Sequence, residues 1–269
     1  MKTDLAFPNL YDFTSEIAIL LVGVVVVYLL SRALKLHPKP ITIEGLKKET
    51  IAVFIVIAAL FVARFALDTL GYLVVLPTFT LYKLPPYPPF AAADVLWGVL
   101  MQAVFLLLMI LAMKRTGQSL GSIGVTGVDK WRNLALGLVL SAIYVAATGL
   151  LGGGTFAGFS TSLVYVFIVM AIVGFIQEIV WRGYVQTRLT ARVGTVKGLV
   201  VTALLFGLWH FPTRYFQYGV ASEALADIFV GLPISLLLGY VMLRSQNIIP
   251  ASILHLFVNV SSFLWQLPT

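Results

Sequence analysis

The stretch Val166–Tyr184, VFIVMAIVGFIQEIVWRGY, decides the fold of this chain. Its length and apolar character predict a membrane-spanning helix, because about 20 such residues cross the hydrocarbon core of a bilayer. Gln177, Glu178 and Arg182 interrupt the apolar run. Ionisable groups at membrane depth are costly, and they usually line a cavity or a pathway. The stretch therefore predicts a helical membrane protein with a polar site inside it.

Two later apolar segments carry polar residues of the same kind. His210 lies in Leu204–Phe211, LLFGLWHF, and His255 and Asn259 lie in Ala251–Val260, ASILHLFVNV. Neighbouring membrane spans that each donate such a group predict one shared polar site. We expect this site among the last four helices of the chain.

The composition is that of a polytopic membrane protein. Hydrophobic residues make up 60% of the 269 positions and charged residues 11%, and the mean hydropathy is +0.99. The chain has no cysteine, which excludes disulfides, thiol nucleophiles and cysteine metal sites. We expect an all-α fold, a single transmembrane helical domain over residues 1–269. It should have eight spans, at about 17–34, 50–70, 94–113, 133–151, 161–183, 196–211, 224–243 and 249–266.

Lysine and arginine residues gather in alternate connections between these spans. The connections after spans one, three, five and seven hold 14 of the 18. The positive-inside rule then places these connections in the cytoplasm and both termini outside. Because the net charge of +7 is spread along one membrane face, it indicates no nucleic-acid partner.

Residue spacing predicts the depth of the polar site. Gly194 is the expected turn between spans five and six, and it lies 16 residues from both Glu178 and His210. An antiparallel hairpin that turns there would bring these two side chains to the same depth. His255 lies about 10 Å from the cytoplasmic end of the last span, at 1.5 Å per helical residue. We therefore expect a site in the inner half of the bilayer, facing the cytoplasm.

Two charged pairs have the i, i+4 spacing of a helical ion pair. One is Glu178 with Arg182, and the other is Arg64 with Asp68 in the second span. We interpret the Arg64–Asp68 pair as structural, because no matching polar residues accompany it. Trp181 fits an aromatic anchor at the membrane interface.

The polar motifs, taken together, resemble the membrane-embedded CAAX protease and bacteriocin-processing family, which includes the type II CAAX prenyl endopeptidases. That family has the order Glu-Glu-x-x-x-Arg, Phe-x-x-x-His and His-x-x-x-Asn on successive late helices. The resemblance covers about residues 172–260 and predicts a family core at about 161–266. In this chain the motifs stand as Gln177-Glu178-Ile-Val-Trp-Arg182, Phe206-Gly-Leu-Trp-His210 and His255-Leu-Phe-Val-Asn259.

The resemblance implies an intramembrane endopeptidase with an activated water. In the family, the first Glu and the first His activate the water that attacks the peptide carbonyl. Those two roles fall on Gln177 and His210 in this sequence. His255 and Asn259 would stabilise the oxyanion that develops, as hydrogen-bond donors in a dry site.

The remaining motif residues have supporting roles under the same resemblance. Arg182 and Glu178 would orient the neighbouring groups, and Phe206 would pack beside the site. The implied substrate is a farnesylated or geranylgeranylated CAAX protein or peptide that partitions into membrane lipid and loses its three C-terminal residues. Such an enzyme would lie in a prokaryotic plasma membrane, or in the endoplasmic reticulum of a eukaryote.

Position 177 departs from the family pattern. An amide accepts no proton at neutral pH, so Gln177 cannot serve as the general base that the family's Glu provides. Three explanations compete: a Glu→Gln substitution introduced to trap an inactive state, a natural non-catalytic member, or an active protein in which Glu178 or His210 takes over. The intact remainder of the motifs favours the first, and we expect low activity.

Other classes of function are compatible with the same residues. The set Glu178, His210 and His255 has the composition of a catalytic zinc site with two histidines and one carboxylate, although the spacing is unlike the helical HExxH motif. We expect no cofactor otherwise. A non-catalytic scaffold or binding protein could use the same pocket, and a small-solute transporter could use the same polar cluster.

Overall fold

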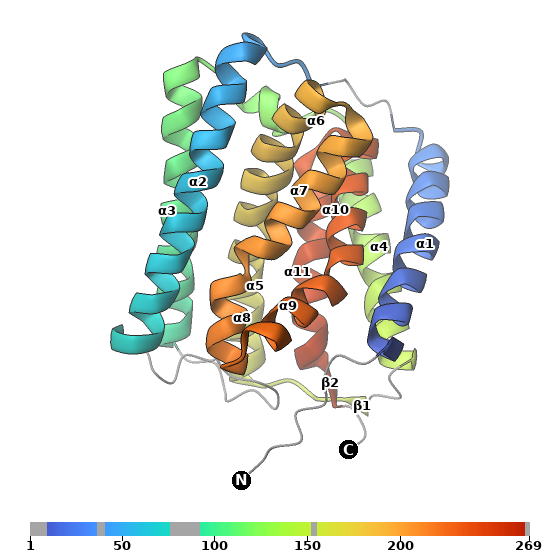
Figure 1. Ribbon diagram of the computed structural model, residues 1–269. Helices are drawn as coiled ribbons and strands as arrows, with labels where there is room; N and C mark the ends of the chain where they lie inside the picture. The colour runs from blue at the N-terminus through green and yellow to red at the C-terminus, as the bar shows by residue number, and fades with distance from the viewer. Residues whose placement is uncertain (1–9, 37–40, 76–91, 152–154, 267–269) are drawn as a thin grey trace.

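The computed structural model describes residues 10–36, 41–75, 92–151 and 155–266, and it is a bundle of long helices (Figure 1). The N-terminal half contains α1 (Leu10–Ala33), α2 (Leu46–Leu70) with a π-helical turn η1 (Gly71–Val75), α3 (Ala92–Thr116), a 3₁₀ turn η3 (Leu120–Ile123) and α4 (Lys130–Leu151). The C-terminal half contains α5 (Thr161–Glu178), the π-helical segment η4 (Ile179–Gln186), α6 (Thr187–Val193), α7 (Thr195–Trp209), α8 (Phe211–Tyr218), α9 (Ala221–Val230), α10 (Leu232–Ser245) and α11 (Ile248–Leu264).

Each of the eight predicted spans coincides with helix in the structure. Among the described residues, seven helical stretches are long and apolar enough to cross a membrane, and α11, with 17 residues, is a shorter apolar helix. Two of the spans are broken, because α7 gives way to α8 at His210 and α9 gives way to α10 at Gly231. Pro212 and Pro233 explain both breaks, since proline is tolerated in the first turn of a helix but not in its interior.

The two ends of the bundle differ in which connections they hold. We call one the basic end; it holds the connections α1–α2, α3–α4, α6–α7 and α10–α11 (top of Figure 1). Hydrogen bonds tie these connections together, from Ile248 N to Gly124 O at 3.1 Å and from Ile41 N to Gln246 Oε1 at 3.0 Å. At the opposite end α1 begins and α11 ends, and the two-residue strands β1 (Thr155–Phe156) and β2 (Trp265–Gln266) pair antiparallel.

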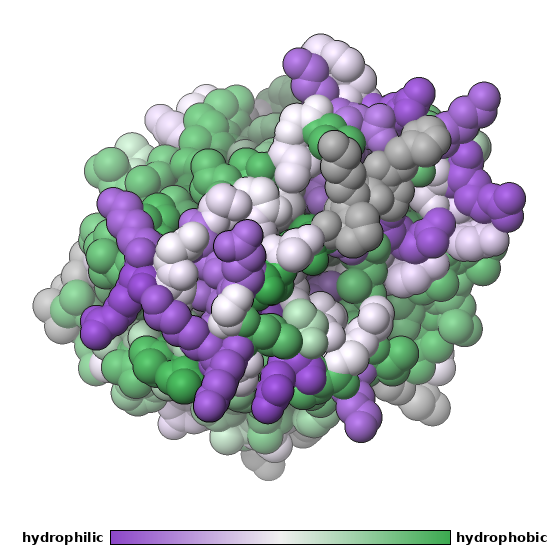
Figure 2. Space-filling model, turned by 90° about the horizontal axis from the view of Figure 1, so that it is seen from above, coloured by the Kyte–Doolittle hydropathy of each residue, from purple (hydrophilic) through white to green (hydrophobic). Residues whose placement is uncertain are grey.

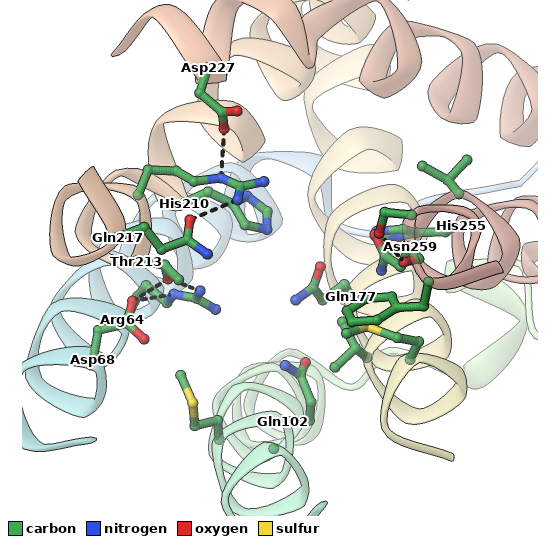
Figure 3. A pocket seen from close by; sticks show the side chains of 18 of the residues that line it. Arg64, Asp68, Gln102, Gln177, His210, Thr213, Gln217, Asp227, His255 and Asn259 are labelled. Atoms are coloured by element: carbon green, nitrogen blue, oxygen red, sulfur yellow. Dashed lines mark hydrogen bonds and ion pairs between the residues drawn. The ribbon is translucent and has the colours of Figure 1, made fainter. Parts of the chain in front are cut away.

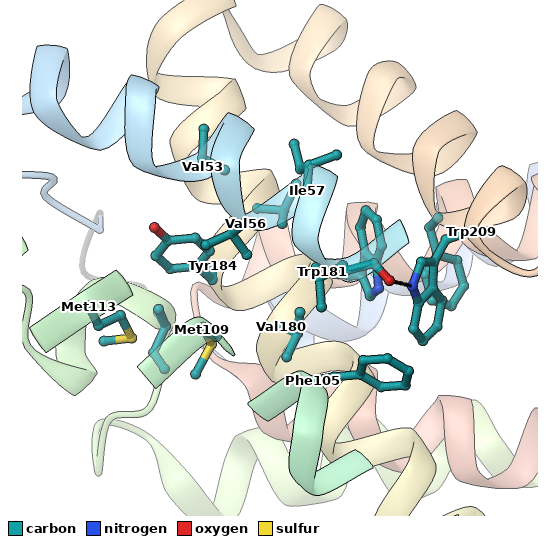
Figure 4. Packing of buried hydrophobic residues seen from close by; sticks show 14 of the residues in the cluster. Val53, Val56, Ile57, Phe105, Met109, Met113, Val180, Trp181, Tyr184 and Trp209 are labelled. Atoms are coloured by element: carbon teal, nitrogen blue, oxygen red, sulfur yellow. Dashed lines mark hydrogen bonds between the residues drawn. The ribbon is translucent and has the colours of Figure 1, made fainter. Parts of the chain in front are cut away.

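The largest apolar cluster packs α2 and α3 against η4 and α7 (Figure 4). Trp181 is fully buried in it, with its ring 5.6 Å from that of Trp209, so the prediction of an interfacial anchor is wrong. Arg188, at the start of α6 near the basic end, is also fully buried. The sequence indicated neither burial, because only the packing of other helices around these two side chains produces it.

Candidate active site

A cavity of about 430 Å³ opens between α2, α3, α5, α8, α9 and α11 (Figure 3). Four of the predicted site residues line it: Gln177, His210, His255 and Asn259. They come from α5, from the junction of α7 and α8, and from α11. The structure therefore brings these four residues, which come from separate late helices, to one cavity.

The adjacent residues Gln177 and Glu178 face different surroundings. Gln177 lines the cavity, and its Oε1 has no hydrogen-bond partner among the described residues. Glu178 is fully buried outside the cavity lining and is bonded through Oε1 to His255 Nδ1 at 2.8 Å. Neighbours on a helix are rotated by about 100°, which explains this division. Glu178 therefore reaches the cavity only through His255.

Arg182 forms an ion pair with the other carboxylate oxygen of Glu178, Oε2. Its Nε lies 3.4 Å from Glu178 Oε2, and its NH2 group donates to Ser235 Oγ at 2.9 Å and to Ser235 O at 3.1 Å. Both charged side chains are fully buried. Since Glu178 is paired with a guanidinium, its oxygens act as acceptors, so the His255 Nδ1–H donates to it. This fixes the His255 ring and directs Nε2 away from Glu178.

The tautomer of His210 follows from its own hydrogen bond. Nδ1 lies 2.8 Å from the carbonyl oxygen of Phe206. A carbonyl oxygen only accepts, so Nδ1 carries the hydrogen and Nε2 of the neutral ring has a free lone pair. His210 lines the cavity, which gives the space that Gln177 also lines a basic nitrogen.

Phe206 lies between the two histidines. Its ring centroid is 4.6 Å from that of His210 and 5.9 Å from that of His255, edge-on in both cases. The Arg182 guanidinium lies 4.2 Å from the same ring centroid, within cation–π range. Phe206 thus sets the separation of the two imidazoles, as expected of a residue that packs beside the site.

The opposite wall of the cavity was not predicted from the sequence. Arg64 and Asp68 line it, and both bond to Thr213 on α8. The pair is therefore part of the pocket and not only an internal brace of α2. Gln102, buried on α3, also lines the cavity. The sequence signal that could have identified Gln102 is its polar side chain within an otherwise apolar helix. The signal that could have placed Thr213 at the site is Pro212, which indicates a helix break just after His210.

The described residues contain no group of three His, Cys, Asp or Glu side chains placed to bind a metal ion. In the proposed zinc set, Glu178 is paired with His255 Nδ1 and Arg182, so its oxygens are already engaged. The geometry of the described residues therefore gives the zinc hypothesis no support.

The cavity extends toward the end of the bundle opposite the basic end. Ser262 and Phe263, near the end of α11, line it, as does Asp227 on α9. We call this end the pocket end. Two sequence predictions are therefore incompatible: the site cannot face the cytoplasm if the termini lie outside, because the site and the first and last helix ends share one end of the bundle.

Comparison with known proteins shows a similarity to one protease family. Residues 159–261 match the family model described as type II CAAX prenyl endopeptidase Rce1-like. A curated relative, CAAX prenyl protease 2 of Methanococcus maripaludis, is 27% identical over 115 residues, which cover 39% of this chain and 42% of that protein. The chain thus aligns with less than half of the relative's length. The matched residues 159–261, which hold all three polar motifs, are thus similar to the Rce1-like type II CAAX prenyl endopeptidases.

Proposed function

We propose that this protein is an intramembrane endopeptidase whose water nucleophile is held between position 177 and His210. The observation that carries the proposal is the meeting of Gln177, His210, His255 and Asn259 in one cavity enclosed by membrane helices. The family match over residues 159–261 supports a hydrolase of the CAAX protease type.

The proposed reaction needs a proton acceptor at position 177. A glutamate there takes a proton from the water as its oxygen attacks the scissile carbonyl, and later returns the proton to the leaving amine. His210 Nε2 accepts a hydrogen bond from the same water and orients it. In the present chain Gln177 can hold the water but cannot take its proton. We therefore propose that the chain is a weakly active or inactive form.

His255 and Asn259 form the oxyanion side of the site in this proposal. The Asn259 amide donates directly. His255 donates from Nε2 only when its ring is doubly protonated, because Nδ1 is already bonded to Glu178. The buried carboxylate of Glu178 provides the counter-charge for that form. Glu178 is a positioning residue, since it touches His255 and not the reacting atoms.

The proposed substrate is a prenylated CAAX tail, cleaved to release its C-terminal tripeptide. The name of the methanococcal relative supports this choice, and the cavity size fits the pockets of small ligands, which hold about 300–1,000 Å³. Met101, Met170 and Val173 give one wall an apolar surface for the side chains of the tripeptide. The proposed partners are a farnesylated or geranylgeranylated protein and the surrounding lipid.

Cleavage of a fluorogenic farnesylated CAAX peptide by detergent-purified protein tests the proposal. We expect Gln177→Glu to raise the rate by about 10²–10⁴, the usual contribution of a general base. The matched control is Gln102→Glu, which places a new carboxylate in the same cavity from α3 and should give no gain. Activity should survive chelators, because the proposed chemistry uses no metal.

The other outcomes are equally decisive. Equal cleavage by the chain and by the Gln177→Glu variant would show that His210 suffices as the base, and the role given to position 177 would be wrong. If the two forms neither cleaved nor bound the peptide, the CAAX substrate would be removed. Binding of the peptide by both forms, without cleavage by either, would instead favour a non-catalytic binding protein.

A further inference from the structure

One wall of the active-site cavity carries a guanidinium that plays no part in the proposed reaction. Arg64 on α2 lines the cavity, across from Gln177, and its side chain is buried. Figure 3 shows the guanidinium directed into the space between the helices. A buried charge is costly unless it is paired and hydrogen-bonded, so each hydrogen-bond donor of Arg64 should have a partner.

Two of the three nitrogens of the Arg64 guanidinium have such a partner. Nε lies 2.7 Å from Asp68 Oδ2, and Nη2 donates to Thr213 Oγ1, which donates in turn to the same carboxylate oxygen at 2.6 Å. The remaining nitrogen, Nη1, donates to no group among the described residues. In Arg188, by contrast, all three nitrogens donate. Arg64 therefore presents an unmatched donor to the cavity.

The indole of Trp209 sets the distance between Arg64 and the reacting groups. The guanidinium carbon lies 4.6 Å from the ring centroid, within cation–π range, and the Trp209 Nε1–H donates to the carbonyl of Leu60 at 3.0 Å. The His210 ring lies 5.0 Å from the same indole. An extended peptide advances about 3.3–3.6 Å per residue, so three residues span about 10 Å. This length matches the separation of two groups that pack on one indole.

The exposed cations of the described chain are remote from this wall. Figure 2 shows hydrophilic side chains across the basic end, and every Lys or Arg that is exposed among the described residues lies in or beside the connections of that end. The second arginine of the cavity lining, Arg214, is partly exposed, and it is paired with Asp227 at 2.7 Å and with Gln217 at 2.8 Å. Arg64 is therefore the enclosed cation that an anionic group inside the cavity would meet.

We infer that Arg64 binds the free α-carboxylate at the C-terminus of the substrate tail. A carboxylate accepts short, charge-assisted hydrogen bonds from a guanidinium, and Nη1 supplies such a donor. Anchoring the chain end there places the peptide bond before the last three residues beside Gln177 and His210. Arg64 thus selects an unblocked chain end and sets the length of the released peptide. The inference rests on the proposed function, because it names what positions the scissile bond in that reaction.

Two peptides that differ only at the chain end test the inference. One is the fluorogenic farnesylated CAAX peptide as the free acid, and the other is the same peptide with a C-terminal amide. Both are offered to the Gln177→Glu protein in detergent. We expect kcat/KM to be about 10- to 100-fold higher for the free acid, the usual effect of a hydrogen bond to a charged group. Equal kcat/KM for the two peptides would overturn the inference.

Variants of the two cavity arginines show which one recognises the chain end. Arg64→Gln should reduce the ratio of acid to amide cleavage to about one, and Arg64→Lys, which keeps the charge, should retain part of the ratio. Because Arg64→Gln leaves Asp68 unpaired, the double variant Arg64→Gln/Asp68→Asn provides a second measurement without an uncompensated carboxylate. Arg214→Gln should keep the ratio. Loss of the ratio in Arg214→Gln, with retention in Arg64→Gln, would show that Arg64 is not the residue that binds the carboxylate.

Peptide binding separates a failure of this inference from a failure of the proposed function. The unaltered chain, which has Gln177, is titrated with fluorescently labelled forms of both peptides, and anisotropy reports binding. If the Gln177→Glu protein cleaves neither peptide, the proposed hydrolase is wrong. The inference still stands in that case if the unaltered chain binds the free acid about tenfold more tightly than the amide and Arg64→Gln removes the difference. Equal binding of the two peptides, or binding of neither, would overturn the inference as well.

Discussion

Two buried glutamate–arginine clusters, whose arginines lie on the same continuous helical stretch, have nearly the same construction. In one, Arg182 binds Glu178 and both the hydroxyl and the carbonyl of Ser235. In the other, Arg188 binds Glu49 at 2.9 Å and both the carbonyl and the hydroxyl of Ser122, at 2.8 and 2.9 Å. All four charged side chains are essentially inaccessible.

The clusters differ in where the second carboxylate oxygen goes. Glu178 Oε1 bonds to His255, which lines the cavity. Glu49 Oε1 has no hydrogen-bond partner among the described residues, and its cluster joins α2 to α6 near the basic end. A buried ion pair is weak evidence of function by itself, because such pairs also lock helices together. What marks the Glu178 cluster is the histidine that it holds in place.

Glu178→Gln, made in the Gln177→Glu background, should give the largest loss. Without the carboxylate, His255 loses its counter-charge and its fixed orientation, and a misplaced catalytic group costs about 10²-fold. The rate of peptide cleavage by folded protein measures it. Glu178→Asp keeps the charge but shortens the reach, so it should retain part of the activity. Full activity of the Glu178→Gln variant would show that the Glu178 cluster, like the Glu49 cluster, has only a structural role.

Phe206→Leu should give a smaller loss, of about tenfold, because the imidazoles of His210 and His255 both pack on this ring. Phe105→Leu is the matched control: Phe105 is buried in the same aromatic cluster, 4.8 Å from the Trp209 ring, and it does not line the cavity. Both variants should lose similar thermal stability. Equal loss of activity in the two would mean that Phe206 acts through packing alone.

The comparison also explains how far the sequence could be read. Glu178 and Arg182 are four residues apart, so the geometry of a single helix predicts that they pair. The three polar motifs predicted which helices contribute to one site. Glu49 and Arg188 are separated by 139 positions, and only tertiary packing joins them, so the sequence did not indicate that Arg188 is buried in an ion pair. The wall of the cavity formed by Arg64, Asp68 and Thr213 was missed for the same reason.

The π-helical winding of η4 was beyond sequence reasoning as well. It follows Glu178 directly and contains Arg182, and single-turn π-segments are frequent at functional sites. Nothing in the apolar periodicity of the stretch indicated it. The membrane orientation was predicted from charge, whereas the end at which the cavity opens required the positions of α8 and α9.

Glu49→Gln should change stability but not the rate of cleavage, which makes it the smallest expected effect on activity. Breaking a buried pair from one side leaves Arg188 uncompensated and costs about 3–5 kcal/mol, read as an earlier transition in thermal or detergent denaturation. The folded fraction should keep the kcat/KM of its Gln177→Glu parent, because no residue of this cluster lines the cavity. A drop in kcat/KM at full folding would show that the Glu49 cluster also supports the site, and the two arginine clusters would then be one functional unit.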